Sequence, residues 1–249
     1  MTSGLTASSI LRAWECAARR HPIDRALVLL WSADPTLTTA ELAGLAIGER
    51  DRRLLMLHRV TFGDGLDCLA TCPACQTPQE FELSARALLS AAEGNVGQGR
   101  PAPVLSEDGH TVRVRSLDSN DLAAAARCTD VESAAATLLD RAVALAETAD
   151  GPVSPDALPP SLRERIADCL AEWQSEADIL LDLRCADCGH TWDAALDIVA
   201  FFWAEIEAEA ERMLREVAAL ARLYGWSETE VLALSPLRRQ TYLALGSSH

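Results

Sequence analysis

Two Cys-x-x-Cys pairs constrain this chain more than any other feature of its sequence. Cys72 and Cys75 form the first pair, Cys185 and Cys188 form the second, and 109 residues lie between the pairs. The turn inside such a pair points both sulfurs at one position, and two pairs supply the four thiolates of a tetrahedral zinc site. Simple zinc ribbons place their pairs only about 15 to 20 residues apart. The spacing therefore predicts one structural zinc ion that joins two distant segments.

Other uses of these cysteines remain open. A redox-active Cys-x-x-Cys needs only one pair beside a βαβ unit, and an iron–sulfur cluster also accepts four thiolates. His190, two residues after the second pair, could replace one sulfur. A zinc ion held by four thiolates has no position left for water or substrate, so we expect a structural site. The remaining cysteines have no partner at ligand spacing and are expected to be small buried residues: Cys16, Cys68, Cys128 and Cys169.

The composition favours a helical protein that binds other proteins. Hydrophobic residues make up 49% of the 249 residues and aromatic residues only 5%, which favours packed helices over a β-sandwich. The formal net charge is −15, and an acidic surface repels phosphate backbones, so we expect no nucleic-acid binding. All 22 basic residues are arginines, which excludes Schiff-base chemistry by a lysine and is also typical of bacteria with GC-rich genomes.

The sequence also predicts a cytoplasmic protein that is not an enzyme. Its first residues lack the basic region and apolar stretch of a signal peptide, and no window reaches the about 18 apolar residues of a membrane-spanning helix, so we expect no membrane insertion. Paired cysteines in a reducing compartment indicate metal rather than disulfides. The sequence has no phosphate-binding Gly-x-x-x-x-Gly-Lys loop, no Gly-x-Ser-x-Gly elbow and no His-Glu-x-x-His helix.

The predicted fold is α+β and mostly helical. Extended segments flank both cysteine pairs and indicate a small zinc-ribbon-like β element, while helical periodicity dominates elsewhere. We divide the chain into a helical N-terminal segment, two zinc-ribbon halves, an inserted helical subdomain with short strands, and a long C-terminal helix with a helical hook: residues 1–65, 66–83 with 178–195, 84–177, and 196–249.

Several elements are predicted within these segments. A capping box at Thr38 starts a longer helix of the N-terminal segment, and Gly225 ends a helix that begins near residue 197. Gly189 is expected to serve as the turn residue of the second cysteine pair. The insertion is predicted to contain a strand, three helices and an exposed loop rich in glycine and proline: residues 111–115, then 118–128, 132–147 and 160–174, and 94–103.

The two cysteine turns and the C-terminal residues together resemble a known family. The matching stretches are ATCPAC at 70–75, ILLDLRCADCGH at 179–190 and YGWSETEVLALSPLRRQTY at 224–242. They resemble baseplate proteins of contractile phage tails and phage-tail-like contractile injection systems, in the group related to the hub subunit or hub-assembly chaperone. The resemblance implies a structural or assembly component of a baseplate, with hub, spike or other baseplate proteins as partners.

Within this resemblance, the C-terminal hook is the expected partner-binding region. Aromatic residues dominate interface energetics, and neighbouring guanidinium groups can clamp carboxylates of another subunit or cap helix carbonyls. The same side chains could instead close their own core, as could Trp203. The candidates are Trp226, Leu232, Leu234, Arg238, Arg239 and Tyr242. The alternative functions are a zinc-ribbon adaptor or regulatory protein and, less favoured by the residues, a thiol oxidoreductase.

Overall fold

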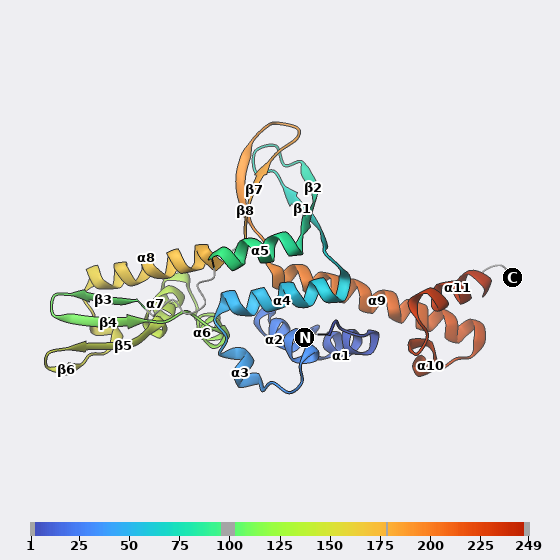
Figure 1. Ribbon diagram of the computed structural model, residues 1–249, viewed down its shortest axis with the longest axis horizontal. Helices are drawn as coiled ribbons and strands as arrows, with labels where there is room; N and C mark the ends of the chain where they lie inside the picture. The colour runs from blue at the N-terminus through green and yellow to red at the C-terminus, as the bar shows by residue number, and fades with distance from the viewer. Residues whose placement is uncertain (1–2, 96–102, 178, 247–249) are drawn as a thin grey trace.

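The computed structural model describes residues 3–95, 103–177 and 179–246 of the chain. Its fold is α+β and mostly helical, which confirms the predicted fold class. A helical body lies at the centre, and three parts project from it (Figure 1). These parts are a pair of β-hairpins, an insertion that contains further strands, and the C-terminal helices, which leave the body on the side opposite to the insertion.

The body is formed by the N-terminal helices together with the first part of the long helix α9. Thr38 starts α3 with the predicted capping box, in which its hydroxyl accepts from the Glu41 N–H and the Glu41 carboxylate accepts from the Thr38 N–H. The single helix expected after Thr38 is two helices, because Gly44 ends the first of them. The body helices are α1 (Ala7–Ala17), α2 (Pro22–Ala33), α3 (Thr39–Ala43), α4 (Ile47–Phe62) and α9 (Ile198–Tyr224).

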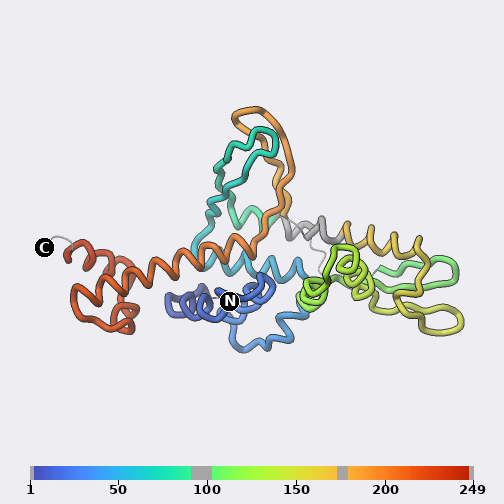
Figure 2. The backbone as a smooth tube through the Cα atoms, turned by 180° about the vertical axis from the view of Figure 1, so that it is seen from behind, coloured from blue at the N-terminus to red at the C-terminus, as the bar shows by residue number. Residues whose placement is uncertain are grey.

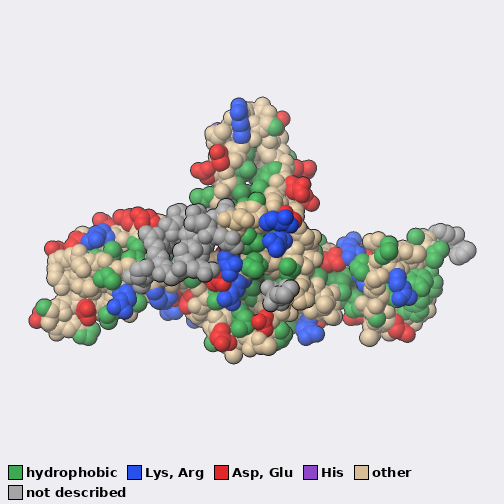
Figure 3. All heavy atoms as spheres, in the orientation of Figure 1, with side chains coloured by type: hydrophobic (Ala, Val, Ile, Leu, Met, Phe, Trp, Pro, Cys, Tyr) green, Lys and Arg blue, Asp and Glu red, His purple; other side chains and the backbone are tan. Residues whose placement is uncertain are grey.

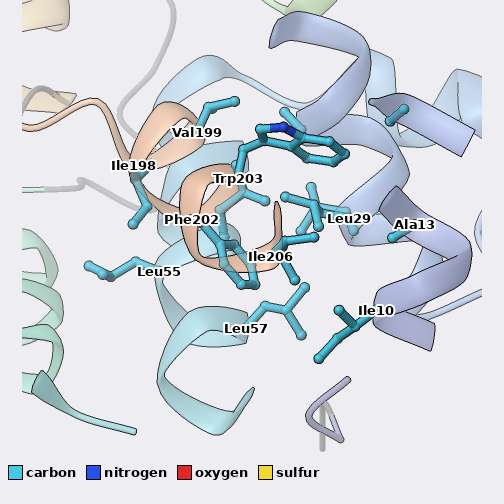
Figure 4. Close-up of a cluster of buried hydrophobic side chains, with 14 of the residues drawn as sticks. Ile10, Ala13, Leu29, Leu55, Leu57, Ile198, Val199, Phe202, Trp203 and Ile206 are labelled. Atoms are coloured by element: carbon cyan, nitrogen blue, oxygen red, sulfur yellow. The ribbon is translucent and has the colours of Figure 1, made fainter. Parts of the chain in front are cut away.

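Apolar side chains from α1, α2, α4 and α9 meet in one core (Figure 4). Phe202 and Ile206 of α9 are fully buried, and Trp203 is 3% exposed, so Trp203 closes the body's own core. Leu29 of α2 and Leu57 of α4 belong to the same cluster. Burial of each such side chain stabilises the fold by roughly 1.5–3 kcal/mol. The core therefore fixes the start of α9 against the N-terminal helices.

Two antiparallel β-hairpins project side by side from the body (Figures 1 and 2). Strand β1 (Gly65–Thr71) pairs with β2 (Pro78–Ser84), and β7 (Leu180–Arg184) pairs with β8 (Thr191–Ala195). Each hairpin is a separate two-stranded sheet. An isolated hairpin is at best marginally stable in water. Each hairpin therefore depends on its neighbour and on the cysteine cluster described below.

The insertion between the hairpins has its own sheet and its own core. Four antiparallel strands lie in the order β3-β4-β5-β6. Val112 and Val114 of β4 are fully buried with Leu162 of α8, as the alternation of this strand predicted for the two valines. The elements are α5 (Ala85–Asn95), β3 (Val104–Glu107), β4 (His110–Val114), α6 (Ser119–Ala125), α7 (Val131–Ala142), β5 (Val143–Thr148), β6 (Gly151–Pro152), the 3-10 helix η1 (Pro155–Ala157) and α8 (Pro160–Ala177).

One predicted helix of the insertion was wrong in its second part. The helix expected over 132–147 ends at Ala142, and the following residues form β5, which pairs with β4. Apolar periodicity alone does not distinguish a helix from a strand over these residues. The strand forms because the backbone groups along β4 need hydrogen-bond partners, and β5 supplies them only in the folded sheet. The loop predicted at 94–103 lies mostly outside the described residues.

Helix α9 continues for 27 residues, or about 40 Å. Asp197 caps its first turn, and Gly225, in the left-handed conformation with φ of 73°, ends it as predicted. Beyond the body, α9 carries α10 (Glu228–Leu232) and α11 (Pro236–Gly246), which together form the C-terminal hook (Figure 2). No helix in the described part of the chain has the length and apolarity needed to cross a membrane.

A buried carboxylate joins the helices of the insertion to its sheet. Asp121 of α6 is fully buried and accepts hydrogen bonds from Arg115 at 2.7 and 2.8 Å, from Arg141 at 2.7 Å, and from the backbone N–H of Asp118 at 2.9 Å. Burial raises the pKa of this carboxyl, but the bonds from Arg115, Asp118 and Arg141 outweigh it and lower the pKa from 3.8 to about 2. Asp121 thus ties α6 to the end of β4 and to α7.

We predict that Asp121→Asn destabilises the insertion by roughly 2 kcal/mol or more, because two arginines lose a charged partner. The folded pKa lies below the unfolded one, so the carboxylate stabilises the fold fully above about pH 4 and loses this effect as the pH falls towards 2. Urea unfolding at pH 7 and at pH 3 measures the effect. The difference between wild type and variant should be large at pH 7 and smaller at pH 3.

Asp140→Asn is the matched control for this experiment. Asp140 pairs with Arg163 at 2.7 Å, but its side chain is 38% exposed. Loss of such an exposed pair should cost less than about 1 kcal/mol. Equal stabilities of the Asp121→Asn and Asp140→Asn variants would contradict the role given to Asp121.

Candidate metal centre

Each cysteine pair lies in the turn of its hairpin, and the two turns share a backbone pattern. The carbonyl of Cys72 accepts from the N–H of Gln76 at 2.9 Å, and the carbonyl of Cys185 accepts from the N–H of Gly189 at 3.0 Å. Gly189 has a φ of 74°, which confirms its predicted turn role. Gln76 takes the equivalent position in the first turn with a φ of 61°, a conformation that few residues other than glycine adopt.

The two turns bring the four predicted ligands together. All four Sγ atoms lie within 4.8 Å of one another, with Cys72 and Cys188 3.7 Å apart and Cys75 and Cys185 3.6 Å apart. Four sulfurs about 2.3 Å from a zinc ion lie roughly 3.8 Å from one another, so the cluster fits one ion. These separations far exceed the about 2.05 Å of a disulfide, and all eight cysteines are free. Four thiolates in this arrangement favour zinc.

The close approach of four sulfurs makes their ionisation interdependent, so a bound cation would favour four thiolates. Hydrogen bonds from the hydroxyl and the backbone N–H of Thr77 lower the pKa of Cys75 from 9.0 to about 6. A backbone hydrogen bond from His190 lowers the pKa of Cys188, but burial and the neighbouring sulfurs outweigh it and raise this pKa to about 12. Like charges at this spacing repel one another, so four thiolates cannot coexist here without compensation. A divalent metal ion supplies that compensation.

Gln79 connects the two hairpins beside the cluster, and it was not predicted. Its side-chain oxygen accepts from the backbone N–H of Ala186 at 2.8 Å, and its side-chain nitrogen donates to the carboxylate of Asp187 at 3.0 Å. Both partners lie inside the second Cys-x-x-Cys turn, more than 100 residues along the chain. No local pattern relates a glutamine of one hairpin to the turn of another, so the sequence carried no signal for this contact.

His190 and the remaining cysteines lie outside the ligand set. The ring of His190 stacks on Trp192 with centroids 6.2 Å apart, and the ligand group among the described residues consists of the four cysteines. Cys68 is buried as predicted, and burial raises the pKa of its thiol. Cys16 is exposed, and Cys128 and Cys169 are half-buried, so the prediction of full burial was wrong for these three.

Two of the predicted partner-binding residues belong to an aromatic cluster of the hook. Trp226 stacks on Tyr224 with centroids 4.8 Å apart and meets Tyr242 edge-on at 4.9 Å. The hydroxyl of Tyr224 donates to the carbonyl of Tyr242 at 2.9 Å. Trp226 and Tyr242 are both half-buried, so they join the ends of α9 and α11 and still present part of their surface. Their binding of a partner stays a prediction.

The expectation that Arg239 binds a neighbouring subunit is corrected by its burial. Arg239 is 1% exposed, and its Nε donates to the carboxylate of Glu216 at 2.7 Å. Its Nη1 donates to the carbonyl of Leu234 at 2.8 Å, in the turn between α10 and α11, so it binds a carbonyl beside a helix end rather than one within a helix. Glu216 lies 23 residues earlier on α9, beyond the reach of local sequence rules. Among the other candidates, Arg238 is exposed, Leu234 is half-buried and Leu232 packs against the main core.

We predict that Cys185→Ser removes the metal and unfolds the hairpin pair. Structural zinc contributes on the order of 10 to 16 kcal/mol in small peptides, which exceeds what two marginal hairpins can replace. Metal analysis of the purified chain should show one zinc ion in wild type and little in the variant. Cys16→Ser is the control, since Cys16 is exposed on α1 and should leave the zinc content unchanged. Undiminished zinc in Cys185→Ser would exclude the four-sulfur site.

A second prediction concerns the ion pair of the hook. Glu216→Leu leaves the Arg239 guanidinium buried without its carboxylate, at a cost of roughly 3 to 5 kcal/mol. The double variant Glu216→Leu with Arg239→Leu removes both charges and should regain much of that stability. Hydrogen exchange of the α11 amides measures both effects. If the α11 amides of the double variant exchange as fast as those of Glu216→Leu, the loss of stability is not caused by the buried, unpaired charge of Arg239.

Comparisons with protein-family models, with curated proteins and with solved structures give no match to this chain. The residues of the chain and their geometry are therefore the basis for its function.

Proposed function

We propose that this chain is a structural or assembly subunit of the baseplate of a phage-tail-like contractile injection system. The observation that carries its structural role is the closed four-cysteine cluster. When all four positions around a tetrahedral ion are occupied by thiolates, no position remains for substrate or activated water. Such a site contributes to folding and not to catalysis, and in our proposal the chain acts through its surfaces rather than as an enzyme.

The baseplate assignment is supported by the resemblance of residues 70–75, 179–190 and 224–242 to baseplate proteins. In the fold, the first two stretches contribute the two cysteine turns, and the third forms the C-terminal hook. The turns and the hook lie on different projections of the body (Figure 1). A protein with several projections from one braced body is suited to contact several neighbours at once. The partners that we propose are hub, spike or other baseplate proteins, met in the bacterial cytoplasm during assembly.

We predict that particles isolated from the source bacterium contain this chain at a fixed ratio to the sheath protein. Deletion of its gene should reduce the yield of complete particles, because a baseplate subunit or its assembly factor is then missing. If finished particles contain the chain, it is a permanent subunit. If the deletion strain loses particles although finished wild-type particles do not contain the chain, it is an assembly factor. Normal particles from the deletion strain would refute the baseplate assignment.

Arg238→Glu tests the role of the hook in this assembly. Arg238 is exposed on α11, so its reversal of charge should lower incorporation into particles and leave the zinc content and the folding of the chain unchanged. Arg113→Glu is the matched control, because Arg113 is an exposed arginine of β4 in the insertion, away from the hook. If both variants are incorporated into particles equally well, Arg238 does not contribute to the interface.

A further inference from the structure

An apolar cleft separates the insertion from the body. Its volume is about 650 Å³, within the range of about 300 to 1,000 Å³ that is usual for ligand-binding cavities. Ala135 of α7 and Ala171 of α8 are among its lining residues, and both are exposed. Its walls come from α4, α6, α7, α8 and the start of α9, and they include Ile47, Leu117, Leu138, Leu139, Leu170 and Leu196. Half-buried leucines thus line an opening that no described side chain fills.

Acidic groups outnumber basic groups in and around this cleft. Arg50 and Asp51 in its wall form an ion pair at 2.7 Å, and Arg50 is 5% exposed. Asp197 also lines the cleft and is exposed, with no basic partner among the described residues. Residues 103–177 of the insertion carry fourteen acidic residues and six arginines. The cleft therefore suits an apolar group that carries positive charge at its edge.

The outer face of α11 has this character. Leu237 is 74% exposed and Leu245 is 56% exposed, and Thr241 lies between them on the same side of the helix. The opposite side of α11 is occupied by the buried Arg239, so these leucines are not needed for the packing of the hook. Figure 3 shows hydrophobic side chains gathered over the C-terminal helices. Exposed leucines at this spacing are typical of a helix that lies in a groove.

The positive charge lies on the same helix. Arg238 is adjacent to Leu237, is exposed, and forms no ion pair with a described residue. Helix α11 carries Arg238 and Arg239 and no acidic residue. The charge of Arg239 is balanced by Glu216 of α9, and the two glutamates of the hook, Glu228 and Glu230, lie on α10. The exposed charge of α11 is therefore the positive charge of Arg238.

We propose that α11 of one copy of this protein docks into the cleft of a second copy. Leu237 and Leu245 enter the apolar cleft, and Arg238 lies against its acidic rim at Asp197. The hook lies at the far end of α9, whereas the cleft is lined by the first residues of α9 and by the insertion on the other side of the body, so one copy cannot fill its own cleft with its own hook (Figure 1). The contact is head to tail, and repetition of such a contact gives a ring if the rotation closes and an open chain if it does not.

A symmetric contact between two α11 helices is the competing arrangement. It would leave both clefts empty and would add no acidic partner for either Arg238, since α11 carries no acidic residue. The cleft, in contrast, has Asp51 and Asp197 among its lining residues, and complementary charges favour one contact over another. The charges therefore favour the cleft as the surface that receives α11.

Sedimentation of the purified full-length chain tests this contact without any baseplate partner. Wild type should associate as its concentration rises. A hook variant, Leu237→Ser with Leu245→Ser, and a cleft variant, Ala135→Trp, should each remain monomeric. Ala135 is exposed, so a tryptophan there fills the cleft without removing a core side chain. Leu69→Ser is the matched control, because Leu69 is 68% exposed on β1, away from both surfaces, and this variant should associate like wild type.

Mixing the two defective variants distinguishes the arrangements. The hook variant keeps an intact cleft and the cleft variant keeps an intact hook, so the mixture should form a one-to-one complex that grows no further. Circular dichroism and zinc content of each variant establish that it is folded. A wild type that stays monomeric, a cleft variant that still self-associates, or a mixture of folded variants that forms no complex would overturn the proposal. These outcomes leave the baseplate assignment untouched, since that assignment is tested on particles.

Discussion

The fold depends on four thiolates that meet from two turns 109 residues apart in the chain. Closing a flexible loop of this length costs roughly 4 kcal/mol in chain entropy. A structural zinc ion contributes on the order of 10 to 16 kcal/mol in small peptides, so coordination can outweigh that cost. The two ends of the segment between the cysteine pairs are held together at the hairpin turns. The insertion, which lies within this segment, can then fold around a core of its own.

Buried charges then fix the orientation of the parts that project from the body. Glu216 of α9 and Arg239 of the hook meet at 2.7 Å, and in the insertion Asp121 accepts hydrogen bonds from two arginines. A purely apolar contact of similar size would tolerate sliding, because dispersion forces have little direction. A buried carboxylate and guanidinium tolerate little movement, since separation would leave a charge without a partner in a place where desolvation is costly. The Glu216–Arg239 pair therefore specifies one arrangement of α9 and α11, and Asp121 specifies one arrangement of α6 with α7 and the end of β4.

Local rules predicted the parts of this structure that local chemistry determines. The Cys-x-x-Cys turns, the turn at Gly189, the end of α9 at Gly225 and the capping box at Thr38 all follow from residues within a few positions of one another. The contacts that were not predicted join distant residues. β5 was assigned to a helix because its strand partner lies about 30 residues earlier, and Gln79 has its partners in the other hairpin. A single sequence shows which side chains can form such bonds, but not which of them the fold brings together.

The metal cluster and the cleft are linked by the covalent chain. Strand β8 starts directly after the second cysteine turn, and its last residue, Ala195, already lines the cleft. Leu196 and Asp197 continue that wall into the first turn of α9, where Ile198 and Phe202 enter the main core. A metal ion in the cysteine cluster would hold one end of β8, and the core holds the residues just beyond its other end. Between these two fixed points the cleft wall would have little freedom, so a bound zinc ion would act on the proposed docking surface through the position of one strand.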